Sequence, residues 1–203
     1  MPCLPKNEKD LRILPRSRTD LIGSASLARS LLTNLTPMAY DRATDTVREN
    51  VHVTDTTHLS ITPRAPFDFA LTAHSHGWVG LPPTSWDAEE GVLGRVERLQ
   101  DGKVVRLSIS DAGSVKAPRV AIAVAHAGAL SPEEQGEIED MVGRILRADE
   151  DLRPFYALCR ERGAPWTEAT KGFGRLLRSP TLFEDAVKTI CTTNIQWGGT
   201  LRM

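Results

Sequence analysis

The stretch VLGRVERLQDGKVVRLSIS, residues 92–110, decides the fold because it holds two strand-like runs on either side of one turn. Residues 92–99 and 104–110 are rich in the β-branched and apolar side chains that strands favour. Between them, Gln100-Asp101-Gly102 supplies residue types that tight turns need. The pattern predicts an antiparallel β-hairpin.

Two further runs predict strands on either side of this hairpin. In residues 67–71, Phe67, Phe69 and Leu71 alternate with polar or small residues, as in a half-buried strand. Residues 119–125, RVAIAVA, are apolar at nearly every position, which predicts a strand covered on both faces. We therefore expect about four antiparallel strands in one small sheet, within a domain spanning residues 61–128.

The hydrophobic period becomes helical in residues 129–203. Ser131, Pro132 and Glu134 have the spacing of an N-cap, a first-turn proline and a capping box. One apolar stripe follows, made of Ile138, Met141, Val142, Ile145 and Leu146. Because strands precede helices without alternating with them, the predicted fold class is α+β.

Two more helices are predicted farther along the chain. Residues 154–160 form the first, with Phe155, Leu158 and Cys159 facing inward. The second begins at Ser179-Pro180 or at Thr181, where Glu184 is placed to close a capping box, and Gly198-Gly199 should end it. Its apolar face is expected to hold Phe183, Val187, Ile190, Cys191 and Asn194.

Residues 1–60 are weakly patterned, with one short helix predicted at residues 20–35 and a second candidate start at Met38. The chain has 203 residues and a net charge of −1, so no global basic field draws it onto nucleic acid. Three widely spaced cysteines imply neither a disulfide framework nor a metal knuckle and are typical of an intracellular protein. No apolar run is long enough to cross a membrane, and the N-terminus does not resemble a secretory signal.

Cations gather in residues 171–203, where Lys171, Arg175, Arg178, Lys188 and Arg202 stand against only Glu184 and Asp185. Basic side chains just before a helix could hold phosphate at its N-terminus, or form a solvated face with surface ion pairs. Asn194, near the end of an apolar helical face, is either a helix cap or a polar group kept for binding.

Other chemically suggestive residues have ordinary interpretations. His74 and His76 would share one face of a strand, and His52, His58 or His126 could add a metal ligand, but we favour surface histidines and predict no metal site. Trp78 and Trp86 are expected to be core or turn-covering aromatics, with base stacking as the alternative.

Two stretches resemble helix-hairpin-helix DNA glycosylases, in the branch of 8-oxoguanine and bacterial 3-methyladenine glycosylases. They are GFGRLLRSPTLFEDAVKTICTTNIQWGGTLRM, residues 172–203, and FDFALTAHSHGWVGLPPTSWD, residues 67–87. The resemblance covers residues 66–203. It implies a TATA-binding-protein-like antiparallel sheet followed by the first helices of an all-α glycosylase domain.

Within residues 172–203, Ile190-Cys191-Thr192-Thr193-Asn194 matches the helix end that carries the gap-filling asparagine of this branch. The resemblance implies that Asn194 fills the space left by an extruded nucleotide. Gly199 stands where the cytosine-reading arginine would be, so recognition of an 8-oxoguanine·cytosine pair is not implied.

The function implied is that of a base-excision DNA glycosylase that removes damaged purines. Its DNA-binding residues would be Asn194, Lys171, Arg175 and Arg178, with no cofactor and no metal. The hairpin and the catalytic Lys and Asp of the family lie downstream of this segment. We therefore expect a catalytically incomplete fragment without a catalytic residue of its own.

The implied partners are damaged double-stranded DNA and a separately encoded C-terminal half, for which Val187 and Ile190 would offer an exposed apolar face. The resemblance to bacterial enzymes implies a cytoplasmic, nucleoid-associated protein. The alternative is a non-catalytic module that binds DNA or protein.

Overall fold

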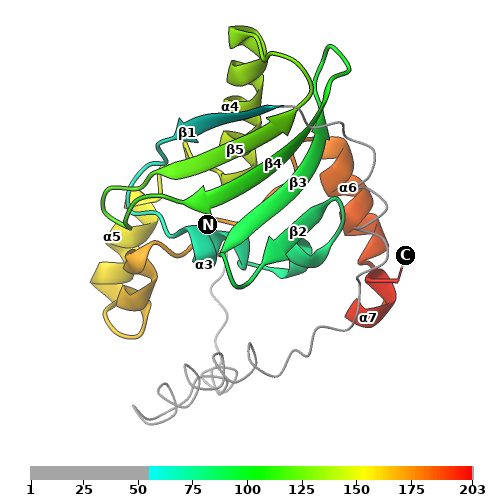
Figure 1. The fold of residues 1–203 in the computed structure, drawn as a ribbon. Helices are drawn as coiled ribbons and strands as arrows, with labels where there is room; N and C mark the ends of the chain where they lie inside the picture. Colours follow the sequence, from blue (N-terminus) through cyan, green and yellow to red (C-terminus); the bar gives the residue numbers. More distant parts are fainter. Residues whose placement is uncertain (1–54, 203) are drawn as a thin grey trace, which may run out of the picture. The chain divides into compact units, whose positions relative to one another are not determined.

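The computed structural model describes residues 55–202, which combine one antiparallel sheet with helices (Figure 1). The predicted α+β class is confirmed. The helix predicted at residues 20–35, the rest of residues 1–54 and His52 lie outside the described range. The elements are β1 (Asp55–Ile61), α3 (Phe69–Ala73), η1 (Gly77–Gly80), β2 (Thr84–Asp87), β3 (Val92–Arg98), β4 (Val104–Asp111), β5 (Val120–His126), α4 (Pro132–Leu146), α5 (Arg153–Arg162), η2 (Trp166–Lys171), α6 (Leu182–Cys191) and α7 (Trp197–Thr200).

The sheet has five strands in the order β1-β5-β4-β3-β2, and each neighbouring pair is antiparallel. The predicted hairpin is confirmed as β3 and β4, with Leu93 opposite Ile109. The edge strand β1 pairs with β5 from Asp55 opposite His126 to Ile61 opposite Val120. The sheet therefore begins before residue 61, inside the segment that was expected to be weakly structured.

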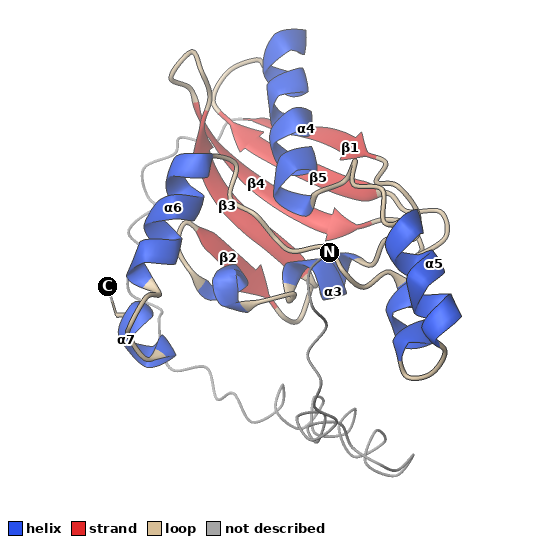
Figure 2. Cartoon of the chain, turned by 180° about the vertical axis from the view of Figure 1, so that it is seen from behind, coloured by secondary structure: helices blue, strands red, loops and turns tan. Residues whose placement is uncertain are grey.

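The core lies between α4 and one face of the sheet, as Figure 2 shows. Alternate residues of β5 separate this face from the other. Val120, Ile122 and Val124 are fully buried, whereas the intervening alanines of this strand are only half-buried. The prediction that β5 is covered on both faces was thus wrong, because its second face carries alanines that require no apolar cover.

Helix α4 follows the prediction closely. Ser131 Oγ accepts a hydrogen bond from Glu134 N at 3.3 Å, and Glu134 Oε2 accepts one from Ser131 N at 2.6 Å, which closes the capping box. The whole predicted stripe is buried: Ile138, Met141, Val142, Ile145 and Leu146. This stripe forms the helical half of the core.

The strand predicted at residues 67–71 is wrong, because α3 occupies residues 69–73 instead. Asp68 is its N-cap, and Asp68 Oδ1 accepts a hydrogen bond from Leu71 N at 2.8 Å. Phe67 and Phe69 are both 3% exposed, as the alternation predicted, but Leu71, the third member of the alternation, is 41% exposed. The Asp68 N-cap favours a helix, whereas the alternating apolar residues favour a strand, and the segment forms the helix.

Helix α5 is present where it was predicted, but its inward face is different. Tyr156 and Cys159 are buried, whereas Phe155 and Leu158 are 39% and 49% exposed. Cys159 was placed correctly and the other two side chains were not. The Tyr156 hydroxyl donates to the carbonyl of Phe173 at 2.9 Å, which fixes this face of the helix.

Helix α6 begins after Thr181, whose hydroxyl accepts a hydrogen bond from Glu184 N at 3.2 Å. The side chain of Glu184 does not close the predicted capping box, because it points to the sheet. The helix ends at Cys191, and Gly198 and Gly199 lie within the following short helix α7. In Figures 1 and 2, α6 lies at the β2 side of the sheet and α7 lies beyond the C-terminal end of α6.

Candidate nucleic-acid interface

An open pocket of about 480 Å³ lies where η1, the segment before α6 and α7 meet. Its walls combine aromatic, apolar and basic side chains, which suits a planar ligand that carries negative charge. The lining residues are His76, Gly77, Trp78, Arg147, Leu176, Leu177, Arg178, Asp185, Thr192 and Trp197. They come from segments far apart in the sequence.

The indole of Trp197 forms one wall and is seated on the backbone of Gly77. A Cβ atom at position 77 would lie 2.4 Å from Cζ2 of Trp197, so only glycine leaves room for the ring. Trp197 is nevertheless 43% exposed, which leaves part of the ring open to solvent. The ring is therefore held in place and still available to a ligand.

His76 organises the opposite wall. Its Nδ1 accepts a hydrogen bond from Trp78 N at 3.2 Å, and its Nε2 lies 2.8 Å from the carbonyl oxygen of Leu177. A nitrogen that accepts carries no proton, so the neutral tautomer with hydrogen on Nε2 satisfies both contacts. The imidazole also stacks edge-on against the Trp78 ring, with centroids 4.9 Å apart.

The segment that carries Leu177 and Arg178 is fixed by residues from distant parts of the chain. Leu177 N donates to Ser75 Oγ at 2.9 Å, and Arg178 N donates to the carbonyl of Ile145 at 2.9 Å. Together with His76, these bonds hold the backbone while the Arg178 side chain stays 46% exposed. The arginine therefore projects from a fixed point.

Two arginines give the pocket its positive charge. Arg178 Nε lies 3.7 Å from Asp185 Oδ2, a long ion pair, and Asp185 Oδ1 is already bound to Ser179 N at 2.8 Å. Arg147 pairs more closely with Glu150, at 2.5 Å between Nε and Oε2. Of the two arginines, Arg178 is the more weakly paired and so is better placed to meet phosphate.

The structure separates the four DNA-binding residues expected from the sequence. Only Arg178 lines the pocket. Lys171 lies outside it and forms an exposed ion pair with Glu168 at 2.5 Å. Asn194 is exposed in the turn after α6, with φ of 58°, a left-handed conformation that asparagine tolerates better than most residues.

Arg175 is buried, with 2% of its surface exposed, and is placed to hold backbone together instead of phosphate. Its guanidinium donates to four carbonyl oxygens, at 2.8 to 3.2 Å, those of Arg64, Pro66, Arg147 and Glu150. It also lies over the Phe67 ring, 5.4 Å from the centroid. The expected DNA contact from Arg175 therefore does not fit this structure.

A buried charge cluster attaches α6 to the sheet. Arg95 Nη2 donates to Glu184 Oε2 at 2.9 Å, and Lys188 Nζ lies 2.6 Å from Glu184 Oε1. Burial would raise the pKa of Glu184, but the hydrogen bonds from Lys188 and Arg95 outweigh burial and lower it. Arg95 also bonds Glu97 at 2.5 Å and Thr84 at 2.7 Å, so β2, β3 and α6 share one network.

Because α6 turns Glu184 and Lys188 to the sheet, its apolar residues face solvent. Leu182, Phe183 and Ile190 are 77%, 79% and 71% exposed, and Val187 is 41% exposed. The sequence correctly placed Phe183, Val187 and Ile190 on one face and correctly predicted that Val187 and Ile190 are exposed. Asn194, expected on the same face, lies beyond the helix, which ends at the half-buried Cys191. Lys188, in contrast, is buried, with its ammonium 5.7 Å from the centroid of the Trp78 ring.

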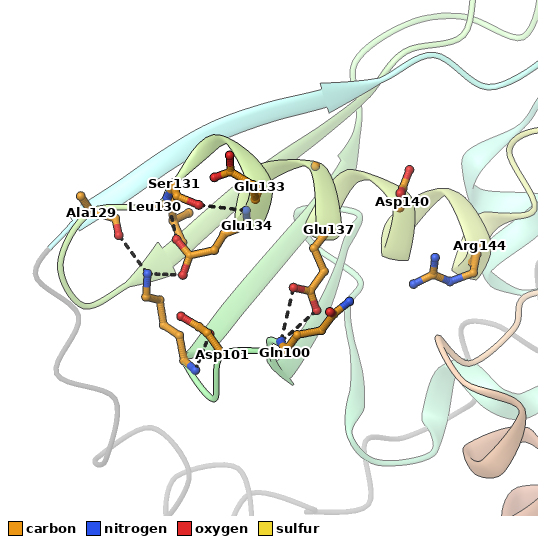
Figure 3. A pocket seen from close by; sticks show the side chains of 12 residues that line it. Gln100, Asp101, Ala129, Leu130, Ser131, Glu133, Glu134, Glu137, Asp140 and Arg144 are labelled. Carbon is orange, nitrogen blue, oxygen red and sulfur yellow. Dashed lines mark hydrogen bonds and ion pairs between the residues drawn. The ribbon is translucent and has the colours of Figure 1, made fainter.

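A larger and more acidic pocket of about 950 Å³ lies between the β3–β4 turn and the start of α4 (Figure 3). Two of its carboxylates, those of Glu134 and Glu137, are held by partners. Glu134 pairs with Lys103, and Glu137 accepts a hydrogen bond from Gln100 N at 3.1 Å. The hydrogen bond from Lys103, followed by that from Ser131 N, lowers the pKa of Glu134 to about 2. This side of the molecule repels phosphate.

The remaining aromatic and histidine residues have structural contacts. Trp86 packs against the core, as predicted, with its ring centroid 6.1 Å from that of Phe69. The His74 ring forms a T-shaped pair with the Trp86 ring, with centroids 4.6 Å apart. His126 bonds Thr57 Oγ1 at 2.8 Å. Within residues 55–202, no three potential metal ligands are grouped, so His74 and His76 are not part of a larger ligand set there.

Trp197 and Gly77 are the functional candidates that sequence reasoning missed. The available signal was a glycine immediately before Trp78 and a tryptophan just after the α6 turn, but nothing in the sequence shows that they meet.

Comparisons with protein-family models, curated proteins and solved structures give no significant match to this chain. Among residues 55–202, no helix is both long and apolar enough to span a lipid bilayer.

Proposed function

We propose that this chain contributes the DNA-binding sheet domain and first helices of a base-excision DNA glycosylase that acts on damaged purines. The observation that carries the proposal is the pocket in which Trp197 and Trp78 stand beside Arg178. The resemblance of residues 66–203 to helix-hairpin-helix glycosylases supplies the class of reaction.

An indole face can stack on the base of a nucleotide, and a guanidinium can bind its phosphate. Bases stack on aromatic side chains with about 1–3 kcal/mol per base, largely independent of sequence, and phosphates bind arginine. A protein that acts on a base extrudes the nucleotide from the duplex. A base can therefore stack in an aromatic pocket only after it has left the double helix. Trp197, seated on Gly77, would meet such a base without first having to be ordered.

Asn194 is included among the proposed contacts because it lies in the chain between Thr192 and Trp197, which both line the pocket. It follows α6 by a few residues, is exposed, and occupies a tight left-handed turn just before Trp197. A short polar side chain there could enter a duplex from the groove and bond the base left unpaired, which is the role implied by the resemblance. The proposed contacts are therefore Asn194, Trp197 and Arg178, without Arg175.

The proposal assigns binding to this pocket and assigns no catalytic residue. Its carboxylate, Asp185, is bound to Ser179 N and faces Arg178, so it is not free to steady a developing positive charge on a sugar. We expect DNA binding without release of a base by these residues alone.

The test is fluorescence anisotropy with labelled duplexes that contain hypoxanthine, 8-oxoguanine, an abasic site or no damage, at low salt. We expect affinities on the order of 10 µM, tightest for the abasic duplex, which is the easiest to open. Trp197→Ala should weaken binding about tenfold, as expected for one lost stacking contact. Equal binding to all four duplexes would favour a non-catalytic DNA-binding module.

Trp166→Ala is the matched control. Trp166 is 51% exposed on η2 and lies outside the pocket, so its loss removes an exposed indole without touching the site. Unchanged DNA affinity for Trp197→Ala, or an equal loss for Trp166→Ala, would refute the pocket assignment. Base release above a buffer blank would refute the expectation that no base is cleaved.

A further inference from the structure

The outward surface of α6 is an uncharged apolar stripe, which we call the α6 face and define as Leu182, Phe183, Ala186, Val187 and Ile190. All five residues are exposed, three of them by more than two-thirds. Their spacing of three to four positions places them along one side of the helix. In Figure 1, α6 lies at the β2 side of the sheet, with β2 and β3 beneath it.

We infer that two copies of the chain associate through the α6 face to form a symmetric dimer. The first reason is area. From the exposed fractions, the face presents on the order of 500 Å² of apolar surface, about the size of the largest patch on a typical monomer, which is often functional. Two such faces bury about 1,000 Å² together, the lower limit for a specific interface.

The second reason is that the face is complementary to itself. A two-fold axis brings the same patch of both copies together, so any charge on it would meet its like. The α6 face has none, because Glu184 and Lys188 are turned to the sheet by their bonds to Arg95 and to each other. The stripe can therefore meet its own copy without repulsion.

The shape of the stripe favours an antiparallel crossing at its centre. Ala186 is small and lies midway between Phe183 and Ile190, so two α6 helices can approach closely there, with the larger side chains beside the crossing. An antiparallel pair also places the positive end of each helix dipole near the negative end of the other. A charged partner, in contrast, would find no counter-ion on this face.

The dimer is independent of the proposed DNA site, because the pocket uses Arg178, Trp197 and the η1 segment and none of the five residues of the α6 face. Failure of the dimer therefore leaves the DNA site standing, and the reverse. The second copy takes the α6 face in place of the separately encoded C-terminal half that was expected there. Trp197→Ala should leave the association state unchanged, and substitutions on the α6 face should leave the stacking contact in place.

Sedimentation equilibrium of the full 203-residue chain, from about 1 to 200 µM, tests the inference, with dissociation expected on the order of 10 µM. Phe183→Glu and Ile190→Glu should each weaken the dimer by roughly tenfold or more. Both side chains are more than 70% exposed, so the variants should fold, which circular dichroism and melting check. Leu158→Glu, at a 49% exposed position on α5, is the control and should dimerise normally.

A short bis-maleimide provides a second readout that depends on the crossing point. In a chain carrying Cys3→Ser and Cys191→Ser, Ala186→Cys should cross-link to its own copy, whereas Leu158→Cys should not. A chain that stays monomeric at all concentrations, or glutamate variants that dimerise like the parent, would overturn the inference. Binding of the dye ANS to such a monomer would show that the α6 face is free for a different chain.

Discussion

The indole of Trp197 and the backbone of Gly77 are in direct contact, with no room for a side chain between them. A Cβ atom built on Gly77 would lie 2.4 Å from Cζ2 and 2.6 Å from Cη2 of Trp197. These residues are 120 positions apart, so the contact ties the region after α6 to the first residue of η1. The pocket wall depends on this one glycine.

Gly77→Ala should therefore displace Trp197 and loosen α7. We expect a loss of about 1–3 kcal/mol in the free energy of unfolding, the usual range for overpacking, together with weaker DNA binding. Chemical denaturation and indole fluorescence report the two effects. Gly80→Ala is the control, because a Cβ there meets no atom within 4 Å and should cost much less.

Arg175→Lys should destabilise the protein by about 2 kcal/mol or more, because an ammonium cannot replace a guanidinium that bonds four carbonyls. The melting temperature measures the loss. Arg178→Lys, at an exposed side chain, should change stability by at most about 0.5 kcal/mol. If Arg175→Lys melts like the parent, the buried guanidinium is not the support described above.

Arg178→Gln should reduce the salt dependence of DNA binding as well as its strength. Loss of one phosphate contact lowers the slope of log K against log salt by about 0.9. Anisotropy titrations between 50 and 200 mM salt, over which the Debye length falls from about 14 to about 7 Å, resolve this change. Arg162→Gln, an exposed position at the end of α5, should keep the parent slope. A slope unaltered by Arg178→Gln would remove Arg178 from the interface.

The Glu184 cluster should make stability depend on pH in acid. The pKa of Glu184 is lowered in the folded protein, so its contribution is complete above the ordinary value of 4.5 and is lost as the pH falls through the folded value. Glu184→Gln should be less stable than the parent at pH 7, and the difference should shrink below pH of about 4.

Melting temperatures at pH 3 to 7 measure this difference. Glu161→Gln, at an exposed position on α5, controls for the removal of one negative charge. A Glu184→Gln variant that follows the parent at a constant offset over the whole range would show that the Arg95 and Lys188 contacts contribute nothing that depends on ionisation.

Local signals predicted the elements that local chemistry decides. The turn at Gln100-Asp101-Gly102 and the capping box at Ser131 each lie within a few residues of what they control, and both elements were predicted correctly. The strand expected at residues 67–71 failed because two local signals compete there, and the Asp68 cap prevails over the alternating phenylalanines.

The orientation of α6 and the role of Arg175 depend on long-range contacts, which local sequence patterns do not reveal. The periodicity of α6 located its apolar side, but only Arg95, 89 positions before Glu184, shows why the polar side faces the sheet. Arg175 looked like a phosphate ligand beside Arg178 because its carbonyl partners lie as far back as Arg64. Of the residues that line the candidate site, Arg178 was foreseen, and Trp197 and Gly77 were missed.

One side of α6 attaches the helix to the sheet through ion pairs, and the opposite side exposes apolar residues to solvent. Substitutions at Leu182, Phe183 or Ile190 can change what the helix meets while the ionic attachment beneath it stays intact. A helix held by its apolar side has no such freedom, because any change of partner would also loosen the fold. Changes on the outer surface of α6 can thus alter its association without loosening the fold, whereas a change at Arg95, Glu184 or Lys188 alone leaves a charge without its partner.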